Sequence, residues 1–301
     1  MPSRTFANLC DELAAMGTSS MTISGEGEPF LHQHIVELIA NAKATGHTVT
    51  VFTNGTALGE DTLRSLIDAR LDRLRVSLWA GSHDEYASAY PGTDPRLFDK
   101  VVATLGLLSR LKLDCRSRYP QLELHHPIDR GNHRHIEAIA DLASNTGCDR
   151  LSFSPFKTQA HQLSSHLLTP DETREVQRSL LRLKRRLGSL GLAHNIDAAL
   201  RRYRIGAAVW ERFPCYIGWV HARVRHDGTV RPCTSFDVPL GNVNESSLPE
   251  IWNSEGFRDF RRRTRTRAGL AEIAASHDCS YCCHALDNLR VHRAFRPLSV
   301  L

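Results

Sequence analysis

Apolar positions in the first two thirds of the chain alternate between helical and extended spacing. Phe6, Leu9, Leu13 and Met16 recur every three or four residues, which predicts a first helix. A repeated change from helix to strand is typical of βα units around a parallel sheet. We predict strands over 20–24, 47–52, 71–78, 119–124 and 149–155, and further helices over 34–45, up to Ala69, over 96–110, over 134–146, and from Pro170 to about Leu190.

The pattern changes after about residue 200. The segment WVHARVRHDGTVRPC (219–233) has two alternating stretches joined at Asp227-Gly228, which predicts a β-hairpin. Two short helices are expected next, over 251–254 and 255–265. We therefore predict two domains, a partial parallel (β/α) barrel over 1–199 and a smaller domain over 200–301.

Composition indicates a globular protein without a membrane span. Hydrophobic residues make up 41% of the 301 positions and charged residues 24%, and no apolar run reaches 18 residues. The N-terminus MPSRTFANLCDEL has acidic residues where a signal peptide would be apolar, so we expect a cytoplasmic protein with no membrane partner.

The net charge of +5 comes largely from two arginine-rich stretches, RLKRRL (182–187) and RDFRRRTRTR (258–267). The simpler interpretation is two solvated helix faces. The alternative is a groove that binds an acidic peptide or nucleic acid, although a nucleic-acid partner is not expected.

Three polar motifs lie at the carboxyl ends of predicted strands. SGEGEP (24–29) follows the first strand, TNG (53–55) follows the second, and Ser77 ends the third. Each motif alone would be read as a tight turn. In a parallel barrel these strand ends share one rim, where ligands bind. Asn54 and Ser77 supply neutral donors and acceptors suited to a ribose or an adenine.

The first of these motifs has the composition of a ligand-binding turn. Gly25 and Gly27 allow the backbone to approach a ligand closely. Glu26 or Glu28 can accept hydrogen bonds from an ammonium group. Together with the other two motifs, this turn predicts a pocket for a polar, partly cationic small molecule.

Four cysteines have the arrangement of a metal site. Cys215, Cys233, Cys279 and Cys282 are separated by 17, 45 and two residues, and the turn at Gly228 brings the strand before Cys233 back along the chain. Four thiolates can bind Zn²⁺ or a [4Fe–4S] cluster, and spacing alone does not distinguish the two.

Other residues are secondary candidates. Cys283 is a substitute ligand or a spectator, while Cys10, Cys115 and Cys148 are interpreted as core thiols. Weaker candidates are Arg116, Arg118 and Arg130 for carboxylate binding, and His125, His126, His161 and His166 as ligands.

Taken together, these motifs resemble the radical S-adenosylmethionine (SAM) superfamily. SGEGEP, TNG and a later strand-end serine match its SAM-binding series in type and order. The segment C-x12-G-x4-C followed by GN, EIWNS, an arginine-rich helix and CxxC is similar to the SPASM/twitch extension, and the absence of further cysteines favours the shorter twitch form. By resemblance, SAM would contact Gly25, Glu26, Gly27, Glu28, Thr53, Asn54, Gly55 and Ser77, and an auxiliary [4Fe–4S] cluster would be held by Cys215, Cys233, Cys279 and Cys282.

The resemblance also implies an activity. Radical SAM enzymes cleave SAM reductively to a 5′-deoxyadenosyl radical, and members with this extension modify a peptide or a small natural-product precursor. An external electron donor such as flavodoxin or ferredoxin would be a partner.

The superfamily signature CxxxCxxC, which holds the catalytic cluster, occurs nowhere in the 301 residues. We expect a first strand and loop of about 15 to 40 residues to be missing, and with them the second, catalytic [4Fe–4S] cluster. The chain as given is then not expected to cleave SAM. The alternative is a non-catalytic, degenerate binding protein with a structural four-cysteine zinc or iron-sulfur site.

Overall fold

Two compact units make up the chain. The computed structural model describes residues 1–156, 161–205, 210, 213–277, 279 and 282–295. One unit is Thr18–Leu200, and the other combines Met1–Gly17 with Arg201–Leu301. The first 17 residues thus group with the C-terminal third of the chain.

A six-stranded parallel sheet forms the centre of the Thr18–Leu200 unit. Its order is the chain order, β1-β2-β3-β4-β5-β6, with β1 and β6 at the two edges. The sheet confirms the predicted βα pattern and the α/β, partial-barrel fold class. The strands are β1 (Ser20–Ile23), β2 (Thr48–Thr53), β3 (Arg73–Ser77), β4 (Gln121–Ile128), β5 (Arg150–Pro155) and β6 (Ala193–His194).

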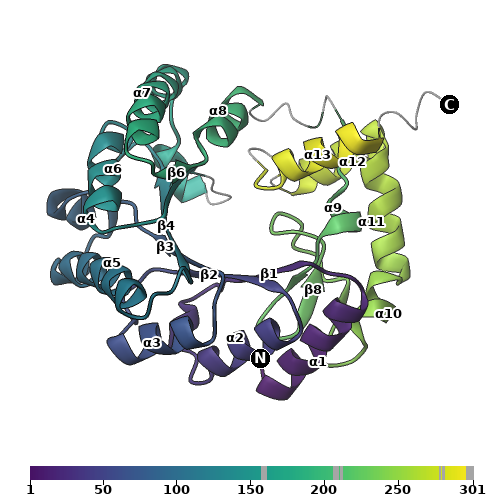
Figure 1. The fold of residues 1–301 in the computed structure, drawn as a ribbon. Helices are drawn as coiled ribbons and strands as arrows, with labels where there is room; N and C mark the ends of the chain where they lie inside the picture. Colours follow the sequence, from purple (N-terminus) through teal and green to yellow (C-terminus); the bar gives the residue numbers. More distant parts are fainter. Residues whose placement is uncertain (157–160, 206–209, 211–212, 278, 280–281, 296–301) are drawn as a thin grey trace. The chain divides into compact units, whose positions relative to one another are not determined.

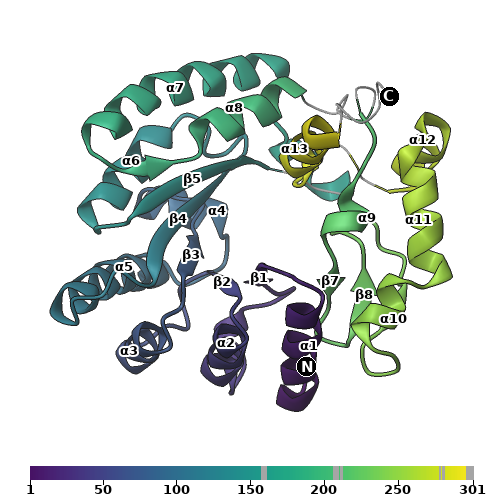
Figure 2. The same ribbon diagram turned by 45° about the vertical axis from the view of Figure 1, so that its right-hand side comes forward.

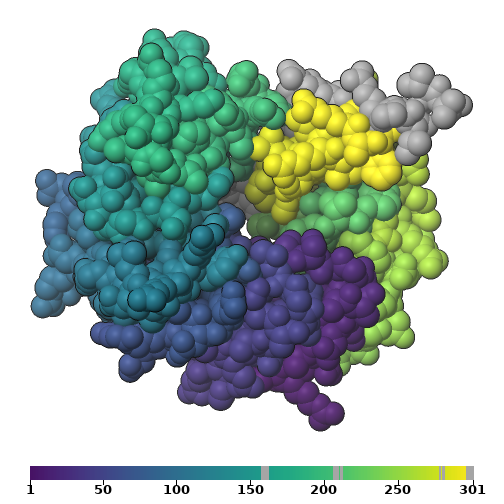
Figure 3. Space-filling view, viewed as in Figure 1, coloured from purple at the N-terminus to yellow at the C-terminus, as the bar shows by residue number. Residues whose placement is uncertain are grey.

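Helices cover the outer side of this sheet (Figures 1 and 2). In Figure 3 their side chains, coloured from indigo to green, make up the outer surface of the unit. Thr169 and Glu172 form a capping box that starts the longest helix, as the sequence predicts for its Thr-Pro start. The elements are η1 (Pro29–Leu31), α2 (Ile35–Ala44), α3 (Glu60–Asp68), α4 (His83–Ala89), α5 (Arg96–Asp114), α6 (Ile136–Asn145), η2 (His161–His166), α7 (Pro170–Ser189) and α8 (Ile196–Ile205).

The two faces of the sheet differ in chemistry. The face that packs on the helices is apolar and fully buried, with Val51, Val76 and Leu124 in neighbouring strands. The opposite, inner face carries polar and charged side chains, because successive residues of a strand point to opposite sides. The register aligns four inner-face residues in one row, Phe52, Arg75, Glu123 and Arg150.

Charge pairing holds this inner-face row together. The Glu123 carboxylate is buried and lies 2.9 Å from Nε of Arg75, 3.5 Å from Nε of Arg73 and 3.9 Å from Nε of Arg150. The Arg75 guanidinium also stacks 4.4 Å from the centre of the Phe52 ring. One carboxylate thus neutralises part of a three-arginine cluster.

The other unit is built on a small antiparallel sheet, β7-β8-β9, flanked by helices. Its first two strands form the predicted hairpin, and Gly228 at the turn has a positive φ of 87°. Trp219 and Val220, which we had placed in the hairpin, instead belong to a helical turn. The elements are α1 (Ser3–Ala15), α9 (Ile217–Val220), β7 (Arg223–Val224), β8 (Thr229–Arg231), β9 (Gly241–Asn242), α10 (Leu248–Trp252), α11 (Glu255–Arg265), α12 (Arg267–Ser276) and α13 (Ala285–Phe295).

Helix α1 packs into the core of this unit. Leu9 joins Val230, Leu248 and Phe257 in one buried apolar cluster. The Glu12 carboxylate accepts a hydrogen bond of 2.7 Å from the Leu248 amide, at the start of α10. Residues more than 200 positions apart in the sequence therefore share one core. In the described part of the chain, no helix is both long enough and apolar enough to cross a bilayer.

Candidate functional site

The loop after β1 is fixed to the end of β2 by one carboxylate. Oε1 of Glu28 accepts hydrogen bonds from the Thr53 hydroxyl at 2.6 Å and the Phe30 amide at 3.1 Å, and Oε2 accepts one from the Asn54 amide at 2.7 Å. An ionised carboxylate has about four acceptor positions. Three are occupied by the protein, so Glu28 can accept about one more hydrogen bond, for example from an ammonium group.

The remaining strand-end residues lie where the sequence predicted them. Gly25, Glu26 and Gly27 are exposed in the loop after β1. A Cβ on Gly25 would lie 2.9 Å from the Gly27 carbonyl oxygen, so this turn has no room for a larger residue. Gly55 has a φ of +80°, which favours glycine, and half-buried Ser77 ends β3.

A histidine on the inner face of the sheet extends this group of polar residues. His125 is the β4 partner of Ser77 in the register. Its Nδ1 hydrogen bonds with the Ser152 hydroxyl at 2.8 Å, and its Nε2 with the Ser154 hydroxyl at 3.2 Å. The sequence offered His125 only as a weak ligand candidate. The two serines were missed, and the only signal for them was their alternation with the apolar residues Leu151, Phe153 and Pro155 in β5.

The secondary arginine candidates do not gather at this rim. Arg116 and Arg118 are exposed in the loop before β4, at the amino end of that strand and not at the carboxyl-end rim. Arg130 follows β4 but pairs with Glu172, with Nε 3.1 Å from the carboxylate.

The histidine candidates other than His125 have structural partners or lie outside the description. His126 is buried on the helix-packed face and hydrogen bonds with the Leu78 carbonyl at 2.9 Å, and burial lowers its pKa to about 4. His166 lies 2.8 Å from the Asp129 carboxylate. The side chain of His161 lies outside the described residues.

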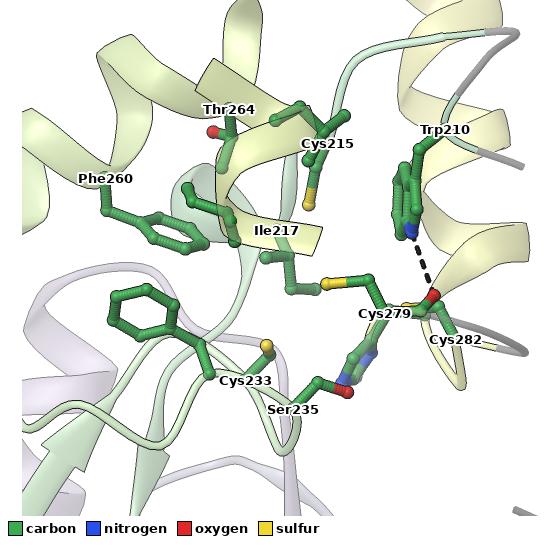
Figure 4. A pocket seen from close by; sticks show the side chains of 13 residues that line it. Trp210, Cys215, Ile217, Cys233, Ser235, Phe260, Thr264, Cys279 and Cys282 are labelled. Carbon is green, nitrogen blue, oxygen red and sulfur yellow. Dashed lines mark hydrogen bonds between the residues drawn. The ribbon is translucent and has the colours of Figure 1, made fainter. Parts of the chain in front are cut away.

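The four predicted cysteines line a single cavity in the C-terminal unit. Cys215, Cys233, Cys279 and Cys282 all contribute to its wall, together with apolar side chains and the polar side chains of Ser235, Thr264 and His284. No carboxylate among the described residues lines it. In Figure 4 the sulfur atoms of Cys215, Cys233 and Cys279 face a common space around Ile217. The spacing of these cysteines in the sequence predicts that they form one group, and the structure places all four around the same cavity.

Backbone hydrogen bonds and burial position these thiols. The Cys215 amide donates to the Thr264 carbonyl of α11 at 3.1 Å, and the Trp210 indole donates to the Cys279 carbonyl at 2.9 Å (Figure 4). Burial raises the pKa of the Cys215 thiol to about 12, and the neighbouring Cys233 and Cys279 add to the shift. Without a bound cation the Cys215 thiol would stay protonated, and a metal centre would supply the charge that stabilises its thiolate.

Among the residues that the structure describes, no three His, Cys, Asp or Glu side chains are grouped so as to hold one metal ion. The four cysteines nevertheless surround the same cavity. In a [4Fe–4S] cluster each thiolate binds a different iron, so the sulfurs surround the cluster and do not converge on one atom. Soft thiolate ligands in a largely apolar shell fit such a cluster.

The other four cysteines differ in exposure. Cys10 and Cys148 are buried, as expected for core thiols, and burial raises the pKa of each to about 11. Cys115 is exposed at the end of α5, so its interpretation as a core thiol was wrong. Cys283 is also exposed, next to Cys282.

The parallel α/β sheet has a polar rim at its strand ends, and a separate small unit has a four-cysteine cavity. These two features define a class of cofactor-binding protein with a (β/α) barrel and an accessory cluster domain. Comparison with known proteins identifies the family. Residues 1–122 match the radical SAM superfamily, and residues 215–284 match the SPASM model, an iron-sulfur cluster-binding domain. Both matches agree with the predicted resemblance to a radical SAM protein with a SPASM/twitch-type extension. The cofactors that follow from the two matches are SAM and [4Fe–4S] clusters.

Curated relatives include enzymes named PqqA peptide cyclase. The protein from Xanthomonas campestris pv. campestris (strain 8004) is 26% identical over 271 residues, which cover 87% of this chain and 68% of the relative. The protein from Methylobacterium sp. (strain 4-46) is 28% identical over 282 residues, covering 87% and 67%. The chain thus spans about two thirds of these relatives.

Solved structures share the fold. SuiB from Streptococcus suis superposes with a TM-score of 0.69 at 14% identity, over 87% of this chain and 62% of SuiB, and SuiB has also been solved with SAM and with the precursor peptide SuiA. The chain therefore spans less than two thirds of SuiB. A structure of anSMEcpe with bound SAM has a TM-score of 0.66 at 16% identity, over 100% of this chain and 86% of anSMEcpe.

Proposed function

We propose that these 301 residues provide the SAM-binding and auxiliary-cluster parts of a radical SAM enzyme that modifies a peptide. Cys215, Cys233, Cys279 and Cys282 hold the auxiliary [4Fe–4S] cluster. The observation that carries the proposal is that four cysteines from three separate segments line one cavity inside a region matched by an iron-sulfur domain model. When bound, the auxiliary cluster would bind substrate or accept an electron from it.

The SAM site of this proposal is the strand-end rim. The free acceptor position of Glu28, with exposed Glu26 as a second acceptor, receives the ammonium group of SAM. The exposed turn at Gly25 and Gly27 lets the methionine part approach the backbone. Thr53, Asn54, Gly55 and Ser77 line the nucleoside.

The substrate is a peptide in this proposal because the curated relatives are named as peptide cyclases. A small natural-product precursor is the other substrate class. Reductive cleavage of SAM takes one electron from outside the protein, and an acidic redox protein such as flavodoxin or ferredoxin is the proposed donor.

The second candidate is a non-catalytic binding protein that keeps the cysteine site for structure. The observation that favours it is the absence of CxxxCxxC from the 301 residues, because three thiolates with that spacing are what the catalytic cluster requires. Both candidates share the cysteine cavity, and they differ in SAM binding and in SAM cleavage.

Iron analysis tests the cysteine site. Anaerobically purified protein is expected to contain about four irons per chain and to absorb broadly near 400 nm. Cys215→Ala and Cys233→Ala should each lower the iron content to below about half, while the exposed-cysteine control Cys115→Ala should leave it unchanged. Stoichiometric zinc in a colourless sample, or an equal loss of iron in all three variants, would refute the assignment.

SAM binding tests the rim and separates the two candidates. Calorimetry with SAM is expected to give binding that Glu28→Ala weakens about tenfold or more. The matched control is Glu60→Ala, an exposed carboxylate in α3 whose partner is Arg64. No binding of SAM by iron-loaded protein would favour the non-catalytic candidate. Under reducing conditions this chain should release no 5′-deoxyadenosine, and its detection would contradict the need for CxxxCxxC.

A further inference from the structure

A basic groove runs along the surface of α11. It encloses about 620 Å³ and is lined by Trp219, Arg258, Arg261, Arg262, Arg265 and Thr266. The four arginines recur at three- and four-residue spacing and therefore share one face of the helix. The sequence favoured a solvated helix face for this stretch, but the structure adds a concave shape and an exposed indole.

The groove carries uncompensated positive charge. Residues 255–267 contain six arginines and two carboxylates. Arg262 is paired with Glu255 and Asp259, at 2.9 and 3.1 Å. Within the part of the chain that the structure describes, the guanidinium groups of Arg258 and Arg265 make no hydrogen bond or ion pair. Two guanidinium groups are thus available to a ligand.

The floor of the groove is rigid. Nε of Arg261 donates to the Gly218 carbonyl at 2.8 Å, and its guanidinium stacks 4.6 Å from the Trp252 ring centre. Its buried Nη2 has no hydrogen-bond partner within the described chain. Burial and the charge of Arg258 lower the Arg261 pKa, which shows that positive charge is crowded here. A carboxylate placed nearby would relieve this crowding.

The groove and the cysteine cavity lie on opposite faces of α11. Phe260 and Thr264 line the cavity (Figure 4), whereas Arg258, Arg262 and Arg265 line the groove. The width of one helix, about 10 Å, therefore separates a ligand in the groove from the cavity.

We propose that this groove binds an acidic, extended segment of a polypeptide, with two carboxylates contacting Arg258 and Arg265 and an apolar side chain packing on Trp219. Seven helical residues span about 10 Å. Alternate residues of an extended peptide point to the same side, so carboxylates at positions i and i+4 lie on one side about 13 Å apart, and the residue at i+2 lies between them on that side. Long arginine side chains can reach both carboxylates, so the groove favours carboxylates at i and i+4 with an apolar residue at i+2. Arg and Trp are also the residue types that contribute most to binding in protein interfaces. This inference deepens the proposed function, on which it rests for the peptide nature of the ligand.

A nucleic-acid backbone fits the same groove less well. Glu255 precedes the arginines and Asp259 lies between Arg258 and Arg261, so the two carboxylates would repel a continuous row of phosphates. A peptide with two separate carboxylates avoids these residues. The groove is also short, because α11 has only 11 residues.

The test is fluorescence anisotropy with a labelled heptapeptide, acetyl-Gly-Glu-Gly-Leu-Gly-Glu-Gly-amide, whose two glutamates and leucine lie on one side of the extended chain, titrated with iron-loaded protein in low salt. Arg258→Glu/Arg265→Glu should weaken binding at least about tenfold. The matched control is Arg178→Glu/Arg185→Glu on α7. It has the same charge change and spacing, at two exposed arginines without a partner in the described chain. This control should weaken binding less than about twofold. The double variant Arg258→Gln/Arg265→Gln removes the two positive charges without reversing them. It replaces the glutamate variant if charge reversal impairs folding.

Three further comparisons complete the experiment. Replacing both glutamates of the peptide by glutamine should abolish binding, and Trp219→Ala should weaken it. The proposal is overturned if the Glu peptide does not bind, if both arginine pairs matter equally, or if a six-nucleotide single strand binds more tightly than the peptide. Iron content and SAM affinity do not involve the groove, so a negative result here leaves the tests of the proposed function intact.

Discussion

Replacing Gly218 by alanine should destabilise the C-terminal unit, although alanine is the better helix former. Gly218 lies in α9, three residues after Cys215, where a Cβ would be 2.8 Å from Cδ1 and 3.0 Å from Cε1 of Phe260. The Phe260 ring cannot move away easily, because it is buried and its centre lies 4.8 Å from that of Phe236. Overpacking of this kind costs about 1–3 kcal/mol. Helix propensity returns at most about 1 kcal/mol, so we expect a net loss of about 1–2 kcal/mol.

Urea unfolding followed by tryptophan fluorescence measures this loss. Three of the four tryptophans, Trp210, Trp219 and Trp252, are in the C-terminal unit. With a slope of about 2 kcal/mol per molar urea, the midpoint should fall by roughly 0.5–1 M. The matched control is Gly188→Ala in α7, where a Cβ would contact nothing within 4 Å. It should raise stability by up to about 1 kcal/mol. If Gly218→Ala unfolds at the wild-type urea concentration or above it, the close approach of α9 and α11 does not restrict the size of the side chain at position 218.

Three other outcomes follow from buried groups. The pKa of His126 is about 4 in the folded protein, below its value near 6.5 in the unfolded chain. The fold therefore favours neutral His126, and unfolding free energy is lost as the pH falls from 6.5 toward 4. Unfolding free energy should drop by about 2 kcal/mol more between pH 7 and pH 5 in wild type than in His126→Asn, and equal drops would exclude this role. Glu123→Gln should cost about 3 kcal/mol in urea unfolding because it leaves three arginines without their shared carboxylate, and a neutral result would show that solvent screens them. Iodoacetamide at pH 8 should label Cys115 and spare Cys10 and Cys148, as read by peptide mass mapping, and rapid labelling of Cys148 would contradict its burial.

Local sequence signals predicted most of the secondary structure, because each depends on neighbouring residues. Alternation in β2, the Thr169 cap of α7 and the glycine turn at Gly228 all lie where they were expected. Helices α12 and α13 were missed, since their apolar spacing is weaker than that of α7. The spacing of the cysteines was also informative, because a hairpin and a CxxC turn restrict where thiols can lie.

Long-range packing could not be predicted in the same way. The periodicity of α1 shows that one face is buried but not what it packs against, and its partner is a cluster near Leu248. Alternation places Arg75 and Glu123 on one face of the sheet. The same alternation would occur whether that face is exposed to solvent or lines a barrel interior, so it does not distinguish the two. Likewise, Glu28 was selected as a ligand-binding residue, whereas its three hydrogen bonds to the protein depend on how two loops meet.

The packing of α1 has a consequence for how the polypeptide is made. When a ribosome has produced Leu9, the residues that will cover it, near Leu248, have not yet been synthesised. The apolar face of α1 therefore stays uncovered until the intervening segment has been synthesised and has folded. Closing so long a loop costs less entropy once residues 18–200 are compact, so the barrel should fold first and bring the two ends together. A recombinant fragment of residues 201–301 would lack this helix, and adding it as a separate peptide should restore its solubility.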